Sequence, residues 1–407
     1  MADLTELSIE QLLEVLQDKK VELWVENGNL KYKAPTEVLD IESMTYISSI
    51  KKDIIAYLER GYIKEAKTIE TFTEQRSCVI RKLLPLCKKP YIISYQNHAY
   101  YLGILSTCEH FEDYFFCNFI NLYYHQNTRI KLNIVTETWY PCESYFLYNK
   151  FTYNTLPDLL NRDNERFAQL MIDMLCSDYY ILGKINEYYV PKRPGYKREY
   201  EEHDFLVYGF DKEKKEFNLI GYNDQKQYQE SMISFEELQK GIFSFKSINW
   251  IDFLKINKDY RFAFKLENLK ILLNDYLQSK NSYAKGTYCK YEGEPCTFGI
   301  NAIESFANDL KTKKSLSSDY LRYFRLLLEH KECMNRRVIY LLDKGYIADR
   351  QILMNYEKIL NGFQVLFISA IKISISFSSV KLNEIIRAML SITKKEAELL
   401  NELYHLL

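Results

Sequence analysis

The sequence predicts an α+β protein that ends in a helical subdomain, and three observations support this. Residues 61–265 contain several strand-like runs together with two amphipathic helical ones. From residue 266 onward, apolar residues recur at helical spacing. Of the 407 residues, 47% are apolar and 27% are charged, enough for a sizeable core. We therefore expect three regions, 1–60, 61–265 and 266–407, with the last two packed as one body.

Charge and composition exclude several classes of protein. The chain has 54 basic and 55 acidic residues, and this balance leaves no excess of positive charge to attract nucleic acid or an anionic membrane. No basic segment precedes an apolar stretch at the start, so the nine cysteines are expected to be reduced and the protein cytoplasmic. The most apolar window, residues 362–377, contains Lys372 and is shorter than the ~20 residues of a membrane span, so we expect a buried element there.

The first region reads as a helix, a hairpin and a second helix. Ser8 is a plausible N-cap for a helix that follows it, and two short alternating strands flank Asn27 and Gly28, a dipeptide that favours a tight turn. Pro35 ends the second strand, and residues 40–59 are periodic and helical. A hydrophobic core of this size gives a fold only marginal stability, which favours a supporting or docking role over catalysis.

This pattern, LLEVLQDKKVELWVENGNLKYKAP followed by IKKDIIAYL, resembles the TubC-type N-terminal docking domain of nonribosomal peptide and polyketide synthetases. The resemblance covers about residues 7 to 60. It implies that the hairpin edge receives a short C-terminal peptide of an upstream synthetase subunit, by strand addition. We expect Trp24, Lys31 and Lys33 to contact that peptide, and the two lysines suit an acidic one. The alternative is that these lysines only prevent an exposed strand edge from pairing with other chains.

In the second and third regions, local patterns predict a series of elements. Strands are expected at 89–96, 130–139, 177–191, 203–210 and 216–222, and helices at 111–126, 155–175, 266–279, 299–310 and 318–342.

The predicted hairpin at residues 201–225 carries one candidate for acid–base chemistry. If Phe210 and Phe217 bracket its turn, His203 faces Asp224, and a shift of one residue brings Asn223 opposite instead. A histidine oriented by an amide or a carboxylate is one half of a cysteine–histidine site. The alternative is that His203 only caps the strand in a polar rim.

A nucleophile would have to lie at the start of a helix, where backbone N–H groups lower the pKa of a thiol. Cys108 precedes the helix expected at 111–126, whereas Cys117 lies inside it among aromatic residues, as an inert packing group. Gln96 and Asn97 precede Cys108 and are candidate oxyanion donors.

The order of a cysteine ahead of a helix, then HDFLVYGFD, then a strand that ends in Asn-Asp, resembles papain-like cysteine enzymes, and more narrowly the BtrH-type acyltransferases. The resemblance covers roughly residues 75 to 400 and includes the helical C-terminal part. It implies acyl transfer from a carrier-protein thioester to an amine through an acyl-cysteine, with His203 as base and Asn223 or Asp224 as its orienter. The sequence has no Asn-Cys or Asp-Cys-Gly signature, so Cys108 is assigned by position.

No metal or nucleotide cofactor is expected. Cys289 and Cys296 lack a second pair of zinc ligands, and the 13 glycines form no phosphate-binding loop. The leading hypothesis is an accessory protein of an assembly line that docks to a synthetase. It would catalyse acyl or peptidyl transfer, or hydrolysis, on a substrate held by the phosphopantetheine arm of a carrier protein. The alternative is a non-catalytic papain-like interaction protein that recruits or positions a synthetase; a peptidase acting on free peptides would need no docking domain.

Overall fold

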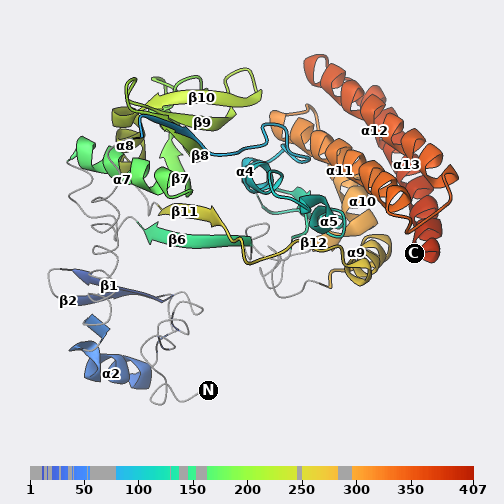
Figure 1. The fold of residues 1–407 in the computed structure, drawn as a ribbon. Helices are drawn as coiled ribbons and strands as arrows, with labels where there is room; N and C mark the ends of the chain where they lie inside the picture. The colour runs from blue at the N-terminus through green and yellow to red at the C-terminus, as the bar shows by residue number, and fades with distance from the viewer. Residues whose placement is uncertain are drawn as a thin grey trace.

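The computed structural model describes two parts of the chain (Figure 1). In the larger part it covers residues 79–128, 130–136, 145–152, 163–244, 250–282 and 296–407. In the N-terminal part it covers residues 12, 16, 21–26, 29–34, 39, 41–52 and 54–55. These two parts have separate hydrophobic cores.

The N-terminal part contains a two-stranded antiparallel sheet and a helix. Strand β1 (Glu22–Glu26) pairs with β2 (Asn29–Lys33), and α2 spans Ile41–Ser49. The pairing agrees with a hairpin centred on residues 27 and 28, which lie outside the described residues, as do Ser8 and Pro35. A small core holds the sheet and the helical segments together, and its buried members are Leu12, Leu16, Val21, Ile47 and Ile54.

The main sheet of the larger part is antiparallel and has the strand order β10-β9-β8-β7-β11-β6, with the short β3 also paired to β8. Its strands β7 and β8 are almost fully buried, which explains their continuous apolar runs. Helices α7 and α8 lie on one side of this sheet, and α4 and the helical part lie on the other (Figure 1). The bounds are β3 Arg81–Leu83, β6 Phe146–Thr152, α7 Asn164–Cys176, β7 Tyr180–Asn186, β8 Glu202–Asp211, β9 Glu216–Tyr222, β10 Tyr228–Ser234, α8 Phe235–Phe243 and β11 Trp250–Ile256.

Two local predictions fail in the segment that precedes the sheet. Residues 89–96 form no strand: this stretch is irregular, and α4 (Gln96–Leu105) begins at its last residue. The helix expected at 111–126 ends early, because α5 spans only Phe111–Phe115. Phe119 has a positive φ of 52°, which no helix tolerates, and the chain then enters a strand.

That strand, β4 (Leu122–His125), is the centre of a small second sheet. It pairs with β5 (Leu132–Ile134) on one side and β12 (Cys296–Phe298) on the other. All four residues of β4 are buried, as expected of a strand covered on both faces. Because β12 belongs to the C-terminal region, this sheet connects the second and third regions.

The described residues of the C-terminal region, 266–282 and 296–407, form five helices, three of them long. These are α9 Leu266–Gln278, α10 Gly299–Leu310, α11 Ser318–Asp343, α12 Gln351–Ile375 and α13 Ser379–Leu406. A buried ion pair of 2.7 Å between Lys331 on α11 and Glu396 on α13 lies among them. Hydroxyl groups of Tyr276 and Tyr356 donate to the same carboxylate, so its charge is fully compensated.

The window 362–377 is not a buried element, contrary to the expectation. It forms the second half of α12 and the turn after it, and only one face of the helix packs against α11 and α13 (Figure 1). By length and composition, α12 alone among the described helices is apolar enough to cross a membrane, and 28% of its most apolar window is buried in the fold.

Candidate functional site

The hairpin β8–β9 has the predicted turn and one irregularity. Phe210 pairs with Phe217, as expected. A bulge between Val207 and Gly209 then shifts the register by one, so that Leu206 pairs with Ile220. The ladder to β9 ends at this pair, and residue 203 is paired only on the other side of β8, with Ile185 of β7.

His203 is paired with glutamates, and the predicted orienters were wrong. Its Nδ1 lies 2.7 Å from Oε1 of Glu187, and its Nε2 lies 3.8 Å from Oε1 of Glu201. The hydrogen bond to Glu187 raises the pKa of the imidazole, which favours the charged form. The His203 side chain is 39% exposed, whereas that of Glu187 is 2% exposed. The base candidate is therefore held as one half of an ion pair at the rim of the body.

Asn223 and Asp224 instead make hydrogen bonds in and around the turn between β9 and β10. The side-chain oxygen of Asn223 accepts hydrogen bonds from the backbone N–H groups of Gln225 and Gln227, at 3.0 and 2.8 Å. Asp224 is exposed, and its backbone N–H donates to the carbonyl of Lys192. The shifted register would have brought Asn223 opposite His203, but the β8–β9 ladder ends at Leu206 and Ile220, before it reaches His203.

A buried network connects Glu187 to the first residue of α4. Arg193, whose side chain is 5% exposed, lies 3.6 Å from Glu187 and donates a 2.9 Å hydrogen bond to the amide oxygen of Gln96. The same oxygen accepts a hydrogen bond from the hydroxyl of Tyr100. The structure thus brings two predicted site residues, Gln96 and His203, into one network. Gln96 acts there as an acceptor, in contrast to the oxyanion donor that was expected.

Close packing leaves little room around this network. A Cβ atom added to Gly221 would lie 2.0 Å from Arg193 Nη2 and 2.9 Å from Gln96 Oε1. The guanidinium therefore fills the space between β9 and the start of α4. Asn97, the other expected oxyanion donor, is the second residue of α4 and is half-buried.

Cys108 lies at the opposite end of α4. Its backbone N–H donates to the carbonyl of Leu105, the last residue of that helix. The following helix, α5, begins at Phe111 as expected, three positions after Cys108, but it has only five residues. Burial raises the pKa of the Cys108 thiol, the opposite of what an activated nucleophile requires.

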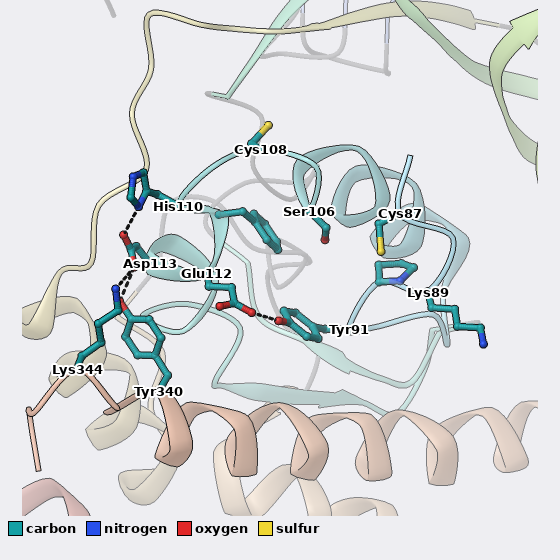
Figure 2. Close-up of a pocket in the computed structure, with 12 residues that line it drawn as sticks. Cys87, Lys89, Tyr91, Ser106, Cys108, His110, Glu112, Asp113, Tyr340 and Lys344 are labelled. Carbon is teal, nitrogen blue, oxygen red and sulfur yellow. Dashed lines mark hydrogen bonds and ion pairs between the residues drawn. The ribbon is translucent and has the colours of Figure 1, made fainter. Parts of the chain in front are cut away.

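Cys108 lines a cavity of about 470 Å³ at that end of α4 (Figure 2). Asp113 is the polar centre of one wall: it accepts a 2.6 Å hydrogen bond from Tyr340 and lies 3.3 Å from Nδ1 of His110 and 3.8 Å from Lys344. Figure 2 shows the sulfur of Cys108 directed away from His110. The cavity combines the thiols of Cys87 and Cys108 with aromatic rings and ion pairs, and the imidazole of His110 is paired with Asp113.

Cys117 is a packing residue, although it lies in the turn after α5 and not inside a helix. Its sulfur is buried and within 3.3 Å of the carbonyl oxygens of Asp113 and Tyr114. Burial raises its pKa as well.

Among the described residues, one group offers atoms suited to a metal. Glu187, Glu201 and His203 each place one ligand atom within 4.8 Å of the others. The guanidinium of Arg193 already lies beside the buried carboxylate, at 3.6 Å, and supplies the positive charge that a cation would bring. This arrangement fits an ion-pair network better than a metal centre.

Sequence reasoning missed Glu187 and Arg193. One local signal was available, because Glu187 follows the apolar run of β7 directly, and a carboxylate buried in such a place needs a charged partner. The identity of that partner depends on tertiary packing.

The N-terminal hairpin places the predicted docking residues together. Trp24 pairs with Lys31, and Glu22 pairs with Lys33, so these four positions share one face of the two-stranded sheet. Lys31 and Lys33 are exposed, and the intervening Tyr32 is 52% exposed.

Comparison with known proteins identifies this unit. Residues 9–60 match the family model of the TubC N-terminal docking domain. The match assigns a docking function to this part of the chain and associates the protein with a synthetase assembly line. No match was found among curated proteins.

Proposed function

We propose that this protein is an accessory subunit of a nonribosomal peptide or polyketide assembly line, in which a papain-like body acts as a non-catalytic adaptor. The observation that carries the proposal is the docking-domain match at residues 9–60. The α+β class of the body, with α4 in contact with β8 of an antiparallel sheet, supports the papain-like part of the proposal.

Docking would occur by strand addition at the N-terminal hairpin. In strand addition, an extended peptide pairs through its backbone N–H and C=O groups with the edge of a sheet, here that of the β1–β2 hairpin. Lys31 and Lys33, on the face shared with Trp24, would then select an acidic C-terminal tail. The upstream synthetase subunit supplies that tail.

An adaptor fits the body better than a cysteine enzyme does. The network of Glu187, Arg193 and Gln96 fills the start of α4, where a papain-like enzyme needs its thiol. Cys108 follows the other end of the helix, and none of its contacts involves His203. The transfer mechanism through Cys108 stays a prediction. If it operates, the substrate arrives on the phosphopantetheine arm of a carrier protein, and the protein itself needs no cofactor.

Calorimetry with the full chain tests the docking proposal. The titrants are synthetic peptides that correspond to the C-terminal tails of synthetase subunits encoded beside this protein. We expect one acidic tail to bind with micromolar affinity, roughly −8 kcal/mol. Lys31→Glu combined with Lys33→Glu should weaken it, most strongly at low salt. Lys52→Glu, an exposed charge change outside the hairpin, is the matched control. Failure of every tail to bind would refute the proposal.

A further inference from the structure

Helix α12 exposes a second apolar face that nothing in the described fold covers. Seven outward residues follow one another at alternating spacings of four and three, the spacing of a coiled-coil seam. All seven are exposed; we call them the α12 stripe, and they are Met354, Lys358, Asn361, Val365, Ile368, Lys372 and Ile375.

The exposure of the apolar members is unusual for residues of this type. Val365 is 63% exposed, Ile368 52% and Ile375 83%. The inner face of the same helix is buried against α11 and α13 through a separate set of apolar residues. A helix with one apolar face normally buries it, so a second exposed apolar face indicates a contact that the isolated chain does not make.

Phe377 and Val380 extend the apolar surface beyond the end of α12. Phe377 lies in the turn between α12 and α13 and is 36% exposed, and Val380, in the first turn of α13, is 65% exposed. The patch therefore runs along the outward face of α12 and continues over the turn between α12 and α13.

The charged members of the stripe have one sign. Between Glu357 and Glu384 the sequence contains three lysines and no acidic residue. Lys358 and Lys372 belong to the stripe itself, two heptads apart, with Val365 midway between them. A partner that fits must therefore be apolar along its centre and acidic beside it.

We propose that the α12 stripe binds one acidic amphipathic helix of a partner protein, as a helix laid along a helix. A second copy of this chain fits less well, because pairing two stripes brings together Lys358 and Lys372 of both copies, and between residues 354 and 375 only Glu357 offers a carboxylate. The proposal does not depend on docking through residues 9–60, since the two surfaces lie on parts of the chain with separate cores.

The test uses the full chain and a synthetic helical peptide of about 21 residues, or three heptads. Its leucines follow the same spacing as the stripe and glutamates flank them; in a matched peptide, lysines replace the glutamates. We expect fluorescence anisotropy to show binding of the acidic peptide, at least about tenfold weaker binding of the basic one, and loss of affinity at high salt. Ile368→Asp should abolish binding, whereas Ile339→Asp, a 38% exposed position on α11, should not.

Three results would overturn the proposal. The first is equal affinity for both peptides, or no binding of either by a protein whose circular dichroism is native. The second is a dimer in light scattering that dissociates in Ile368→Asp, which assigns the stripe to self-association. The third is flotation with phosphatidylglycerol vesicles that Ile368→Asp removes, which assigns it to a membrane surface. None of these readouts involves the tail peptides that test docking.

Discussion

The two ends of α4 differ in a way that bears directly on function. At its start, Gln96, Arg193 and Glu187 form a dense charged network that reaches His203. At its other end the packing opens into a cavity of about 470 Å³ beside Cys108. A ten-residue helix is ~15 Å long, so the imidazole and the thiol belong to different environments.

The difference teaches that the residue types of a cysteine enzyme can be present without forming its site. A working site needs the thiol at the helix start and the histidine beside it, because only then can the imidazole take up the thiol proton. Here the helix start is stabilised by an ion pair, and the thiol lies where burial disfavours its charged form. The predictions below test each end in turn.

The largest effect is expected at Glu187. In Glu187→Gln the buried guanidinium of Arg193 loses its carboxylate, and breaking a buried pair costs about 3 kcal/mol of unfolding free energy. Urea unfolding of the full chain measures this. Glu201→Gln, which removes a 38% exposed carboxylate 3.8 Å from His203, should cost less than about 0.5 kcal/mol. Equal losses in the two variants would contradict the buried network.

A smaller loss is expected where β9 approaches the same network. The added methyl group in Gly221→Ala would overlap Arg193, and overpacking of this kind costs about 2 kcal/mol. If Arg193 causes the penalty, the same change made in an Arg193→Ala background should cost much less. Two equal penalties would assign the cost to the positive φ of 156° at Gly221 and not to contact with the guanidinium.

The ion pair of His203 should appear as a pH dependence. Because Glu187 raises the pKa of the folded imidazole, the stabilisation is fully present below the ordinary value of 6.5 and is lost as pH rises through the folded value. His203→Asn should remove this dependence, and since His203 is 39% exposed the difference should stay below about 1 kcal/mol. Unfolding curves of both proteins below and well above pH 6.5 measure it. A dependence that survives in His203→Asn would assign it to another group.

At the other end of α4, the change expected is in reactivity and not in stability. Burial raises the pKa of Cys108 from 9.0, so its alkylation by iodoacetamide should be slow at neutral pH and accelerate only above that value. Mass spectrometry of the peptide that contains Cys108 gives the rate, and Cys108→Ser identifies the signal. Rapid modification at neutral pH would instead reveal an activated thiolate.

Local patterns predicted much of the fold. The turn that pairs Phe210 with Phe217, and the helices at 266–279, 299–310 and 318–342, agree with the structure within one residue. These elements depend on periodicity and turn chemistry, which a single sequence carries.

The failures depended on distant contacts. The helix expected at 111–126 is interrupted because β4 pairs with β12, about 170 residues later, and no local pattern announces that partner. The early end of the β8–β9 ladder and the pairing of His203 with Glu187 likewise arise only in the folded body, so the orienter of His203 was misassigned. The docking hairpin could be identified because its whole pattern lies within one short segment.

Reconstitution of the assembly line with its purified synthetase subunits tests the central claim most directly. Product formation is compared for the full chain, for Cys108→Ala and for the Lys31→Glu, Lys33→Glu double variant. The account predicts that the docking variant lowers output several-fold at limiting protein concentration, while Cys108→Ala matches the unaltered chain. Loss of product in Cys108→Ala, with docking to the synthetase tail intact, would contradict the account and establish a cysteine enzyme.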